Sequence, residues 1–265
     1  MIDRSKLLSI ALRAADQAAE DILRLYDNGA TASEAKGDGS PVTAADRAAD
    51  RRIREILRSE TSIPIATEED CETHSVCGGP LFWLIDPLDG TKEFIKRTGE
   101  FTVNIALIEN NRPVIGVVVA PAKKIAFYAA AGEGAFVRER GEVSPIRVSN
   151  RDENLRVAVS RDHLTRDDEA LLEALQSCVP VPAGSSLKFC LIAKGAADLY
   201  PRFGRTMEWD TAAGQCVLEE AGGGVSTVTG DPLLYGKEGV DNPSFLAYGD
   251  SSCLAAALAA IRNRT

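Results

Sequence analysis

Apolar residues recur at helical spacing through the first 25 residues of the chain, with acids and bases at the positions between them. The apolar set is Leu7, Leu8, Ala11, Ala14, Ala15, Ala18, Ile22 and Leu25. This pattern predicts an amphipathic helix with one face against a core. After a loop over residues 34–41, a second helix is predicted from about Ala44 to Ser59.

The middle of the chain has the pattern of β-strands. A short strand is predicted at 62–66, and the continuous apolar run at 81–85 indicates a strand buried on both faces. Five more strands are predicted up to about residue 149, at 101–109, 113–120, 124–131, 134–139 and 145–149, because Asn, Gly and Pro separate these segments. We expect the five to form an antiparallel meander.

From about residue 155 onward, predicted strands alternate with predicted helices. The strands are at 156–160, 179–183 and 197–202, and the helices are near 166–177, 186–195 and 211–221. Such alternation is typical of an α/β unit. We therefore expect an N-terminal α+β subdomain over 1–152, which carries the acidic motifs, and a smaller C-terminal α/β subdomain over 153–265, which completes the site.

Composition excludes several classes of protein. The chain has 265 residues, of which 45% are hydrophobic and 26% are charged, as in an ordinary globular protein. It has no run of roughly eighteen apolar residues, so no transmembrane segment is expected, and its start lacks the pattern of a secretory signal. We expect a cytoplasmic protein and leave open an association with the cytoplasmic face of the inner membrane.

Charge and residue counts narrow the partners. The net charge of −9 argues against a nucleic acid polymer, because such binding needs a basic surface. The two histidines, His74 and His163, are too few for a histidine-rich zinc site. The six cysteines lack metal-type spacing and are expected to be reduced, with the role of Cys71 and Cys77 left open. A homodimer is likewise left open.

The strongest local motif is Asp-Pro-Leu-Asp-Gly-Thr at 86–91, directly after the predicted strand at 81–85. Two carboxylates three residues apart can converge on one side of a turn, with the Leu88 carbonyl beside them. Thr91 stands where a helix over 92–95 would begin, a place that suits phosphate. Hard oxygen ligands at such a place indicate magnesium rather than a soft metal. Taken alone, the motif could instead be a turn capped by aspartate.

Other acids follow predicted strands or begin predicted helices. Glu68 and Glu69 follow the strand at 62–66, and Asp210 begins the helix near 211–221. Taken singly, the two glutamates could lie in a solvated loop and Asp210 could be a helix N-cap. Together with the motif at 86–91, they place carboxylates where α/β proteins bind ligands.

These motifs resemble those of the inositol monophosphatase superfamily, a group of metal-dependent, lithium-sensitive phosphatases. The matching segments are 38–46, 68–69, 86–91 and 208–214, so the similarity covers nearly the whole chain. Segments 86–95, 184–190 and 197–202 are similar to its 3′(2′),5′-bisphosphate nucleotidase branch. The resemblance implies a sugar-phosphatase-like α+β fold, a layered α-β-α-β-α sandwich in which N-terminal helices pack on an antiparallel sheet.

The resemblance also implies a set of site residues. Two magnesium ions are implied, with a third, weaker ion near Glu68; the implied metal ligands are Glu68, Asp86, the Leu88 carbonyl, Asp89 and Asp210. The implied catalytic residues are Asp46, Glu68 and Thr91, with Asp46 and Thr91 paired to orient the attacking water. The implied substrate contacts are Glu68, Leu88, Asp89, Gly90, Thr91, His163, Ser185, Lys188, Arg202 and Asp210.

The nucleotidase branch implies hydrolysis of the 3′-phosphate of adenosine 3′,5′-bisphosphate to AMP and phosphate by metal-activated water. This reaction clears a by-product of sulfate assimilation, and the 5′-sulfated form of the nucleotide is left open as a second substrate. The main alternative is inositol monophosphate, or another small sugar or polyol phosphate, on the same fold.

Two further alternatives are disfavoured by the residues themselves. In haloacid-dehalogenase-type phosphatases one residue separates the two aspartates of the motif, whereas two residues separate Asp86 and Asp89. A non-catalytic member of the superfamily would have lost a ligand, and all the implied ligands are present in this chain.

Overall fold

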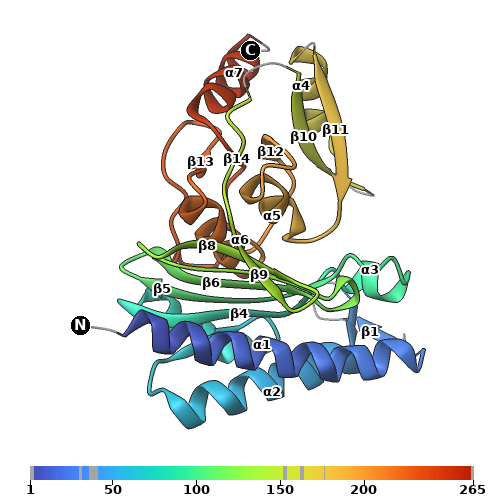
Figure 1. Ribbon diagram of the computed structural model, residues 1–265, viewed down its shortest axis with the longest axis vertical. Helices are drawn as coiled ribbons and strands as arrows, with labels where there is room; N and C mark the ends of the chain where they lie inside the picture. The colour runs from blue at the N-terminus through green and yellow to red at the C-terminus, as the bar shows by residue number, and fades with distance from the viewer. Residues whose placement is uncertain are drawn as a thin grey trace.

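Two N-terminal helices cover one face of a seven-stranded sheet in the computed structural model (Figure 1). The structure describes residues 3–29, 32–35, 41–151, 154–161, 164–175 and 177–263. Helix α1 (Arg4–Asp27) starts at Asp3, whose side chain accepts a hydrogen bond from the Lys6 N–H. Helix α2 (Ala44–Glu60) starts with a capping box between Thr43 and Asp46. Both predicted helices are thus confirmed, and the apolar face of α1 is buried.

The segment before α2 was predicted to be a loop, and this expectation was incomplete. Strands β1 (Ser33–Ala35) and β2 (Pro41–Thr43) form a small antiparallel ladder there. Residues 36–40, which include the start of the motif at 38–46, lie outside the described residues.

The large sheet has the strand order β3-β4-β5-β6-β7-β8-β9. Its first pair, β3 and β4, is parallel, and every other neighbouring pair is antiparallel, which confirms the predicted meander. The bounds are β3 (Ile65–Thr67), β4 (Leu81–Asp89), β5 (Thr102–Glu109), β6 (Arg112–Ala120), β7 (Ile125–Ala130), β8 (Gly134–Glu139) and β9 (Glu142–Ile146).

The last strand of the meander was predicted at 145–149 and lies earlier, at β9. Glu139 pairs directly with Glu142, so only Arg140 and Gly141 form the turn. Both of these residues have positive φ, at 54° and 86°, as the two central residues of a type I′ hairpin turn require. The strand therefore resumes at once after Gly141.

The second sheet has the order β11-β10-β12-β14-β13, in which β10 runs parallel to β11 and β12, while β14 runs antiparallel to β12 and β13. The bounds are β10 (Leu155–Ser160), β11 (Cys178–Ala183), β12 (Leu199–Arg202), β13 (Gly224–Thr227) and β14 (Phe245–Tyr248). The predicted α/β character of this half is confirmed. Strands β13 and β14, and the helix α7 (Ser251–Arg262) after them, had not been predicted from the sequence.

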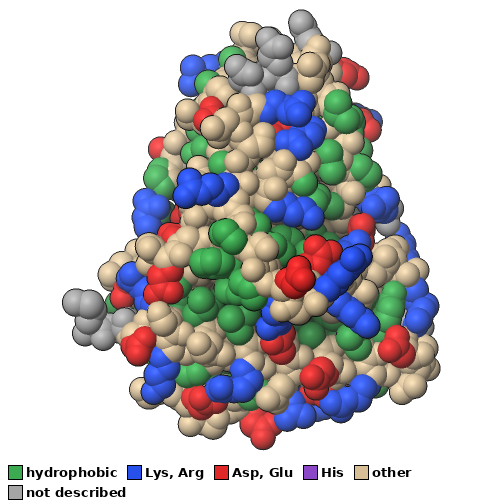
Figure 2. Space-filling view, viewed as in Figure 1, with side chains coloured by type: hydrophobic (Ala, Val, Ile, Leu, Met, Phe, Trp, Pro, Cys, Tyr) green, Lys and Arg blue, Asp and Glu red, His purple; other side chains and the backbone are tan. Residues whose placement is uncertain are grey.

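The layers form the predicted α-β-α-β-α sandwich (Figure 1). Helices α5 (Leu187–Ala193) and α6 (Glu208–Glu220) lie between the two sheets, and α4 (Arg166–Ala174) and α7 cover the outer face of the smaller sheet. One buried cluster joins the inner helices to both sheets, and it includes Phe82 of β4, Phe189 of α5 and Phe245 of β14. On the face shown in Figure 2, acidic and basic side chains are interspersed over all the layers.

The predicted division of the chain at 152/153 stays a proposal. Strand β9 belongs to the large sheet and β10 to the smaller one, so the chain crosses between sheets over residues 147–154. Residues 152 and 153 themselves lie outside the described part of the chain.

Candidate active site

The two acids of the 86–91 motif, Asp86 and Asp89, lie in the last part of β4. The sequence had instead indicated a turn directly after residue 85. Strand β4 pairs with β5 through Asp86 opposite Asn104 and again through Asp89 opposite Thr102, with an irregular register between the two pairs. Pro87 has no N–H for a ladder, so a bulge at this point is the expected response. Asp86 is buried, and its Oδ1 accepts the Leu88 N–H at 3.1 Å.

The predicted pair of Asp46 and Thr91 is brought together. The short helix α3 (Thr91–Ile95) begins one residue earlier than predicted, after Gly90 with φ of 91°. Thr91 Oγ1 lies 3.1 Å from Asp46 Oδ1 and 3.3 Å from the Leu88 carbonyl oxygen. The other oxygen of Asp46, Oδ2, accepts hydrogen bonds from the N–H and the hydroxyl of Thr43.

Glu68 and Asp210 reach the same site from two other elements. Glu68 directly follows β3, and its N–H donates to the Ile85 carbonyl at 3.1 Å. The helix that was predicted to start at Thr211 starts at Glu208, so Asp210 lies in the first turn of α6. Its Oδ2 accepts the Met207 N–H at 2.8 Å, so a side chain within the first turn caps the N-terminus of the helix.

The acids of this site act on one another as like charges. Burial, followed by the charges of Glu68 and Asp89, raises the pKa of Asp86 well above its usual value. Burial and then Asp89 do the same to the pKa of Asp210. Burial raises the pKa of Asp89 to about 6, although the charge of Lys188 opposes this. The site therefore holds more negative charge than its protein surroundings neutralise.

Cations that prefer hard oxygen ligands, such as magnesium, fit this donor set, since it consists of carboxylates and the Leu88 backbone carbonyl. Among the described residues, no group of three Asp, Glu, His or Cys side chains is already arranged to hold a metal ion.

A cavity of 340 Å³ separates the acids from a basic wall formed by the second half of the chain. Its lining includes Glu68, Asp89, Gly90, Thr91 and Asp210 on one side and Ser185, Lys188 and Arg202 on the other. Eight of the predicted site residues are thus brought to one cavity. Asp86 and Leu88 are buried, at 1% exposure each. His163 lies outside the described residues, although Ser160 of the same segment lines the cavity.

Lys188 is a buried cation in this wall. Its Nζ donates to the carbonyl oxygen of Ser185 at 2.7 Å and of Ala183 at 3.4 Å, and it faces the Tyr200 ring at 5.1 Å. Burial lowers the pKa of Lys188 to about 8, and the nearby charge of Asp89 limits the fall. The Ser186 N–H donates to Asp89 Oδ2 at 2.7 Å, so the two walls are also bonded directly.

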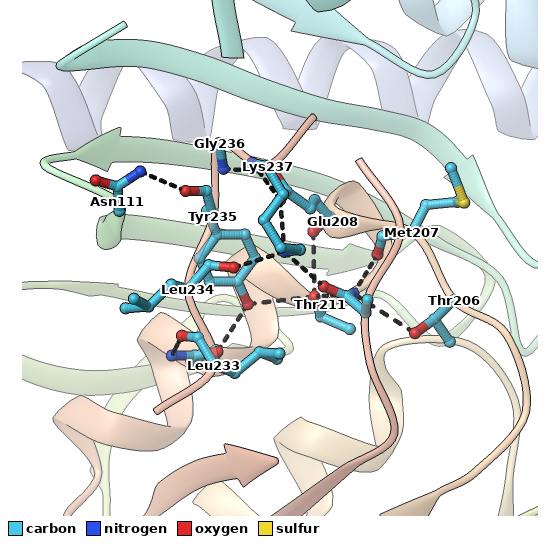
Figure 3. Close-up of polar contacts among 12 residues, drawn as sticks. Asn111, Thr206, Met207, Glu208, Thr211, Leu233, Leu234, Tyr235, Gly236 and Lys237 are labelled. Carbon is cyan, nitrogen blue, oxygen red and sulfur yellow. Dashed lines mark hydrogen bonds and ion pairs between the residues drawn. The ribbon is translucent and has the colours of Figure 1, made fainter. Parts of the chain in front are cut away.

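The sequence analysis missed the residues that hold the first turn of α6. Glu208 is fully buried, and its carboxylate accepts the N–H of Gly236 at 2.7 Å and of Lys237 at 3.0 Å, as well as the Lys237 ammonium (Figure 3). Asn242 Nδ2 donates to the Met207 carbonyl at 2.7 Å and to the Thr211 hydroxyl at 3.0 Å. The local signal was a charged residue at the start of the segment 208–214, which matches a motif of the superfamily.

His74 joins the segments that carry Glu68 and Asp210. It lies in the 3-10 helix η1 (Cys71–Gly78). Its Nε2 lies 2.9 Å from the Thr67 carbonyl oxygen, and its ring is 5.0 Å from the Trp209 ring. In the same helix, burial raises the pKa of the Cys77 thiol to about 11, which disfavours a reactive thiolate there.

Comparison with known proteins gives one consistent result. The model of the inositol monophosphatase family matches residues 3–264. The 3′(2′),5′-bisphosphate nucleotidase CysQ of Salmonella typhimurium is 46% identical over 243 residues, which are 90% of this chain and 98% of that protein. CysQ of Escherichia coli K12 is 44% identical, with the same 90% and 98% coverage.

Solved structures agree in fold. The crystal structure of CysQ from Bacteroides thetaiotaomicron, a bacterial member of the inositol monophosphatase family, has a TM-score of 0.81 at 38% identity and covers 93% of this chain and 98% of that one. The inositol monophosphatase from Anabaena has a TM-score of 0.78 at 27% identity, with 99% and 97% coverage. Among the described residues, we find no helix whose length and apolar character would let it cross a membrane.

Proposed function

The chain belongs to the inositol monophosphatase family, and from this premise we propose that it is a 3′(2′),5′-bisphosphate nucleotidase that hydrolyses adenosine 3′,5′-bisphosphate to AMP and phosphate. The observation that carries the proposal is the two-sided cavity, with the half-buried carboxylates of Glu68, Asp89 and Asp210 on one wall and the buried Lys188 on the other. A substrate with two phosphates needs both walls, one for the scissile phosphate and one for the other. The Salmonella typhimurium and Escherichia coli K12 relatives that carry this enzyme name are 46% and 44% identical to the chain.

We propose that Glu68, Asp86, Asp89, Asp210 and the Leu88 carbonyl hold two magnesium ions, with a third, weaker ion near Glu68. The fit rests on the donor chemistry and on burial, which raises the pKa values of Asp86, Asp89 and Asp210, with the charges of neighbouring acids adding to the rise. Bound magnesium would neutralise this charge and supply an acidified water as the nucleophile.

The pair of Asp46 and Thr91 orients that water in our proposal. The Thr91 hydroxyl donates a hydrogen bond to Asp46 Oδ1, which leaves the lone pairs of Oγ1 free to accept a hydrogen bond from the water. The Asp46 carboxylate cannot turn away, because Thr43 holds its other oxygen with two hydrogen bonds. The backbone N–H groups of Gly90 and Thr91 would hold the scissile phosphate. No covalent phosphoenzyme is needed.

The second phosphate is assigned to Ser185, Lys188 and Arg202. An ammonium group has three N–H donors, and the two carbonyl contacts of Lys188 leave one of them for a phosphate oxygen. The contact between His163 and the nucleoside remains a proposal from the sequence, as does activity on the 5′-sulfated nucleotide.

The test is phosphate release with magnesium from adenosine 3′,5′-bisphosphate, inositol 1-phosphate and fructose 1,6-bisphosphate, compared as kcat/KM. We expect the nucleotide to be preferred by about a hundredfold or more, which corresponds to about 2.7 kcal/mol in the transition state. A preference for inositol phosphate would leave the acidic wall with its role and overturn the assignment of the basic wall.

The cytoplasmic location stays a proposal, as do the two options that the sequence left open, a homodimer and contact with the inner membrane. Light scattering of the purified protein tests for the homodimer, and sedimentation with vesicles of bacterial lipid tests membrane contact.

A further inference from the structure

Glu100, which is not among the predicted site residues, bonds three separate segments of the chain near the cavity. It precedes β5, and its side chain is only 13% exposed. Its Oε1 lies 3.0 Å from Arg161 Nη2 and 3.6 Å from Lys123 Nζ. Its Oε2 lies 3.2 Å from Arg161 Nε and accepts the Gly184 N–H at 2.9 Å. One carboxylate thus bonds the ends of β10, η2 (Pro121–Lys123) and β11 together.

The backbone of Glu100 also fits closely between two loops of the site. A Cβ on Gly184 would lie 2.8 Å from the Glu100 carbonyl oxygen, and a Cβ on Gly90 would lie 3.2 Å from the same atom. Gly90 begins the segment of the scissile phosphate, and Gly184 precedes the segment assigned to the second phosphate. Glu100 therefore lies at the contact between the two walls.

The loop after Gly184 adopts an unfavourable backbone conformation that needs external support. Ser185 has φ of 47°, in the left-handed region that residues other than glycine rarely adopt. Its carbonyl accepts from Lys188, while the next residue, Ser186, donates its N–H to Asp89. Any shift of this loop would move Lys188 relative to the acids.

Arg161 secures the same loop from its other side. Its Nη2 donates to the Pro182 carbonyl at 3.3 Å while it also binds Glu100. The ion pair therefore holds the chain both before and at Gly184. Burial alone would raise the pKa of Glu100, but the bonds and charge of Arg161, the Gly184 N–H and Lys123 together lower it, so the carboxylate is ionised at neutral pH.

We propose that Glu100 is a positioning residue that sets the placement of Ser185 and Lys188 relative to Asp89 and Thr91, and that it thereby determines the preference for substrates with two phosphates. The inference rests on the proposed function, because it presumes that the basic wall binds a second phosphate. It adds a residue that touches neither phosphate.

The test compares two substrates that share the scissile group and the nucleoside, adenosine 3′,5′-bisphosphate and adenosine 3′-monophosphate. In Glu100→Ala we expect kcat/KM for the bisphosphate to fall by about 30-fold or more, while kcat/KM for the monophosphate changes by less than about threefold. Glu100→Gln, which keeps an acceptor for Gly184, and Arg161→Gln are expected to lie between wild type and Glu100→Ala.

A matched control is Glu109→Gln, at the far end of β5, which also removes a carboxylate paired with an arginine, Arg4, at 2.7 Å. It should leave both substrates unaffected. If the Glu100 variants lose activity equally on both substrates, or retain the wild-type ratio, the inference is wrong. If Glu100→Ala does not fold, as judged by circular dichroism, Glu100→Gln and Arg161→Gln decide by the same ratio.

Failure of the proposed function would look different. In that case the wild-type enzyme itself would show no preference for the bisphosphate over the monophosphate, and both proposals would fall together. A wild-type preference that the Glu100 and Arg161 variants fully retain would overturn the inference alone.

Discussion

Asp46 uses each of its two carboxylate oxygens for a different purpose. Oδ2 accepts from Thr43 and so begins α2, while Oδ1 accepts from the Thr91 hydroxyl at the cavity. Burial raises its pKa, and the hydrogen bonds from Thr43 and Thr91 oppose this rise. The start of a helix and the placement of a catalytic hydroxyl thus depend on one side chain, which ties the site to the N-terminal layer.

Removing the Thr91 hydroxyl should slow chemistry and leave metal binding intact. Thr91→Ala is expected to lower kcat by about 10²- to 10³-fold, because the water loses its oriented acceptor. Thr91→Ser, which keeps the hydroxyl, should retain most activity. Steady-state kinetics and magnesium titration by calorimetry measure the two effects; wild-type kcat in Thr91→Ala would remove the pair from the mechanism.

Asp210→Asn should separate stability from activity. The amide can still accept the Met207 N–H, but it removes one charge from a buried cluster of like charges. We expect the thermal midpoint of the metal-free variant to rise above that of the metal-free wild type, and its rate with magnesium to fall by about 10³-fold or more. Differential scanning calorimetry with and without magnesium gives the first quantity. A variant that is both less stable and fully active would contradict the proposed role.

At the scale of helices and strands, the elements with a regular spacing of apolar residues could be predicted from the sequence. The elements whose bounds depend on contacts between residues far apart in the chain were missed. Helix α1 and strand β5 have long, regular apolar patterns. The start of α6 was missed because Met207 is no ordinary cap and Asp210 caps it from inside the first turn. Strands β13 and β14 have four residues each, too few for a period to be visible.

The same contrast holds for the candidate site. Its ligands are local motifs and could be predicted, whereas its supports are pairs of distant residues. Glu208 and Lys237 are 29 positions apart, and Glu100 and Arg161 are 61 apart. No local pattern in the sequence specifies such a pair.

Asp198 connects β10 to the start of β12 and gives a prediction of pH dependence. It is fully buried and accepts the Arg156 N–H at 2.8 Å and the Arg156 side chain at 2.9 and 2.6 Å. Burial alone would raise its pKa, but the bonds from Arg156 outweigh this and lower it. The ionised form therefore stabilises the fold above the unfolded-state pKa of about 3.9, and this contribution is lost as the pH falls through the lower folded-state value.

Asp198→Asn should accordingly lower the free energy of unfolding at pH 7 by about 2 to 3 kcal/mol. The difference from wild type should shrink as the pH falls below about 4 and through the lower folded-state value, where the wild type loses the same charge. Urea unfolding over this pH range measures it, with the exposed Asp231→Asn as control. If the difference in the free energy of unfolding between wild type and Asp198→Asn did not change as the pH fell, the charge of Asp198 would not be the source of its stabilising effect.

At the scale of the whole molecule, the two sheets share one pair of inner helices, and the cavity lies where the layers meet. Asp86 and Asp89 come from the large sheet, while Lys188 and Asp210 come from α5 and α6. Four carboxylates with one nearby buried lysine cannot accept a phosphate dianion on their own.

Activity should therefore vanish on chelation of divalent ions and return with added magnesium. We expect at least about a 10³-fold loss of phosphate release in EDTA, restored in full by excess magnesium. Calcium, which prefers longer and more flexible coordination, should restore much less. Turnover that persists after complete chelation would contradict a metal-dependent mechanism.

The network around Glu208 has a consequence for synthesis on the ribosome. The turn that carries Asp210 is held by Gly236, Lys237 and Asn242, which are translated after it. The large sheet, by contrast, is complete once β9 has emerged. Because chains fold from the N-terminus as they are made, the nascent protein would present the carboxylates at the end of β4 before residues 236–242 exist, and catalytic competence would arise only after those residues have been made.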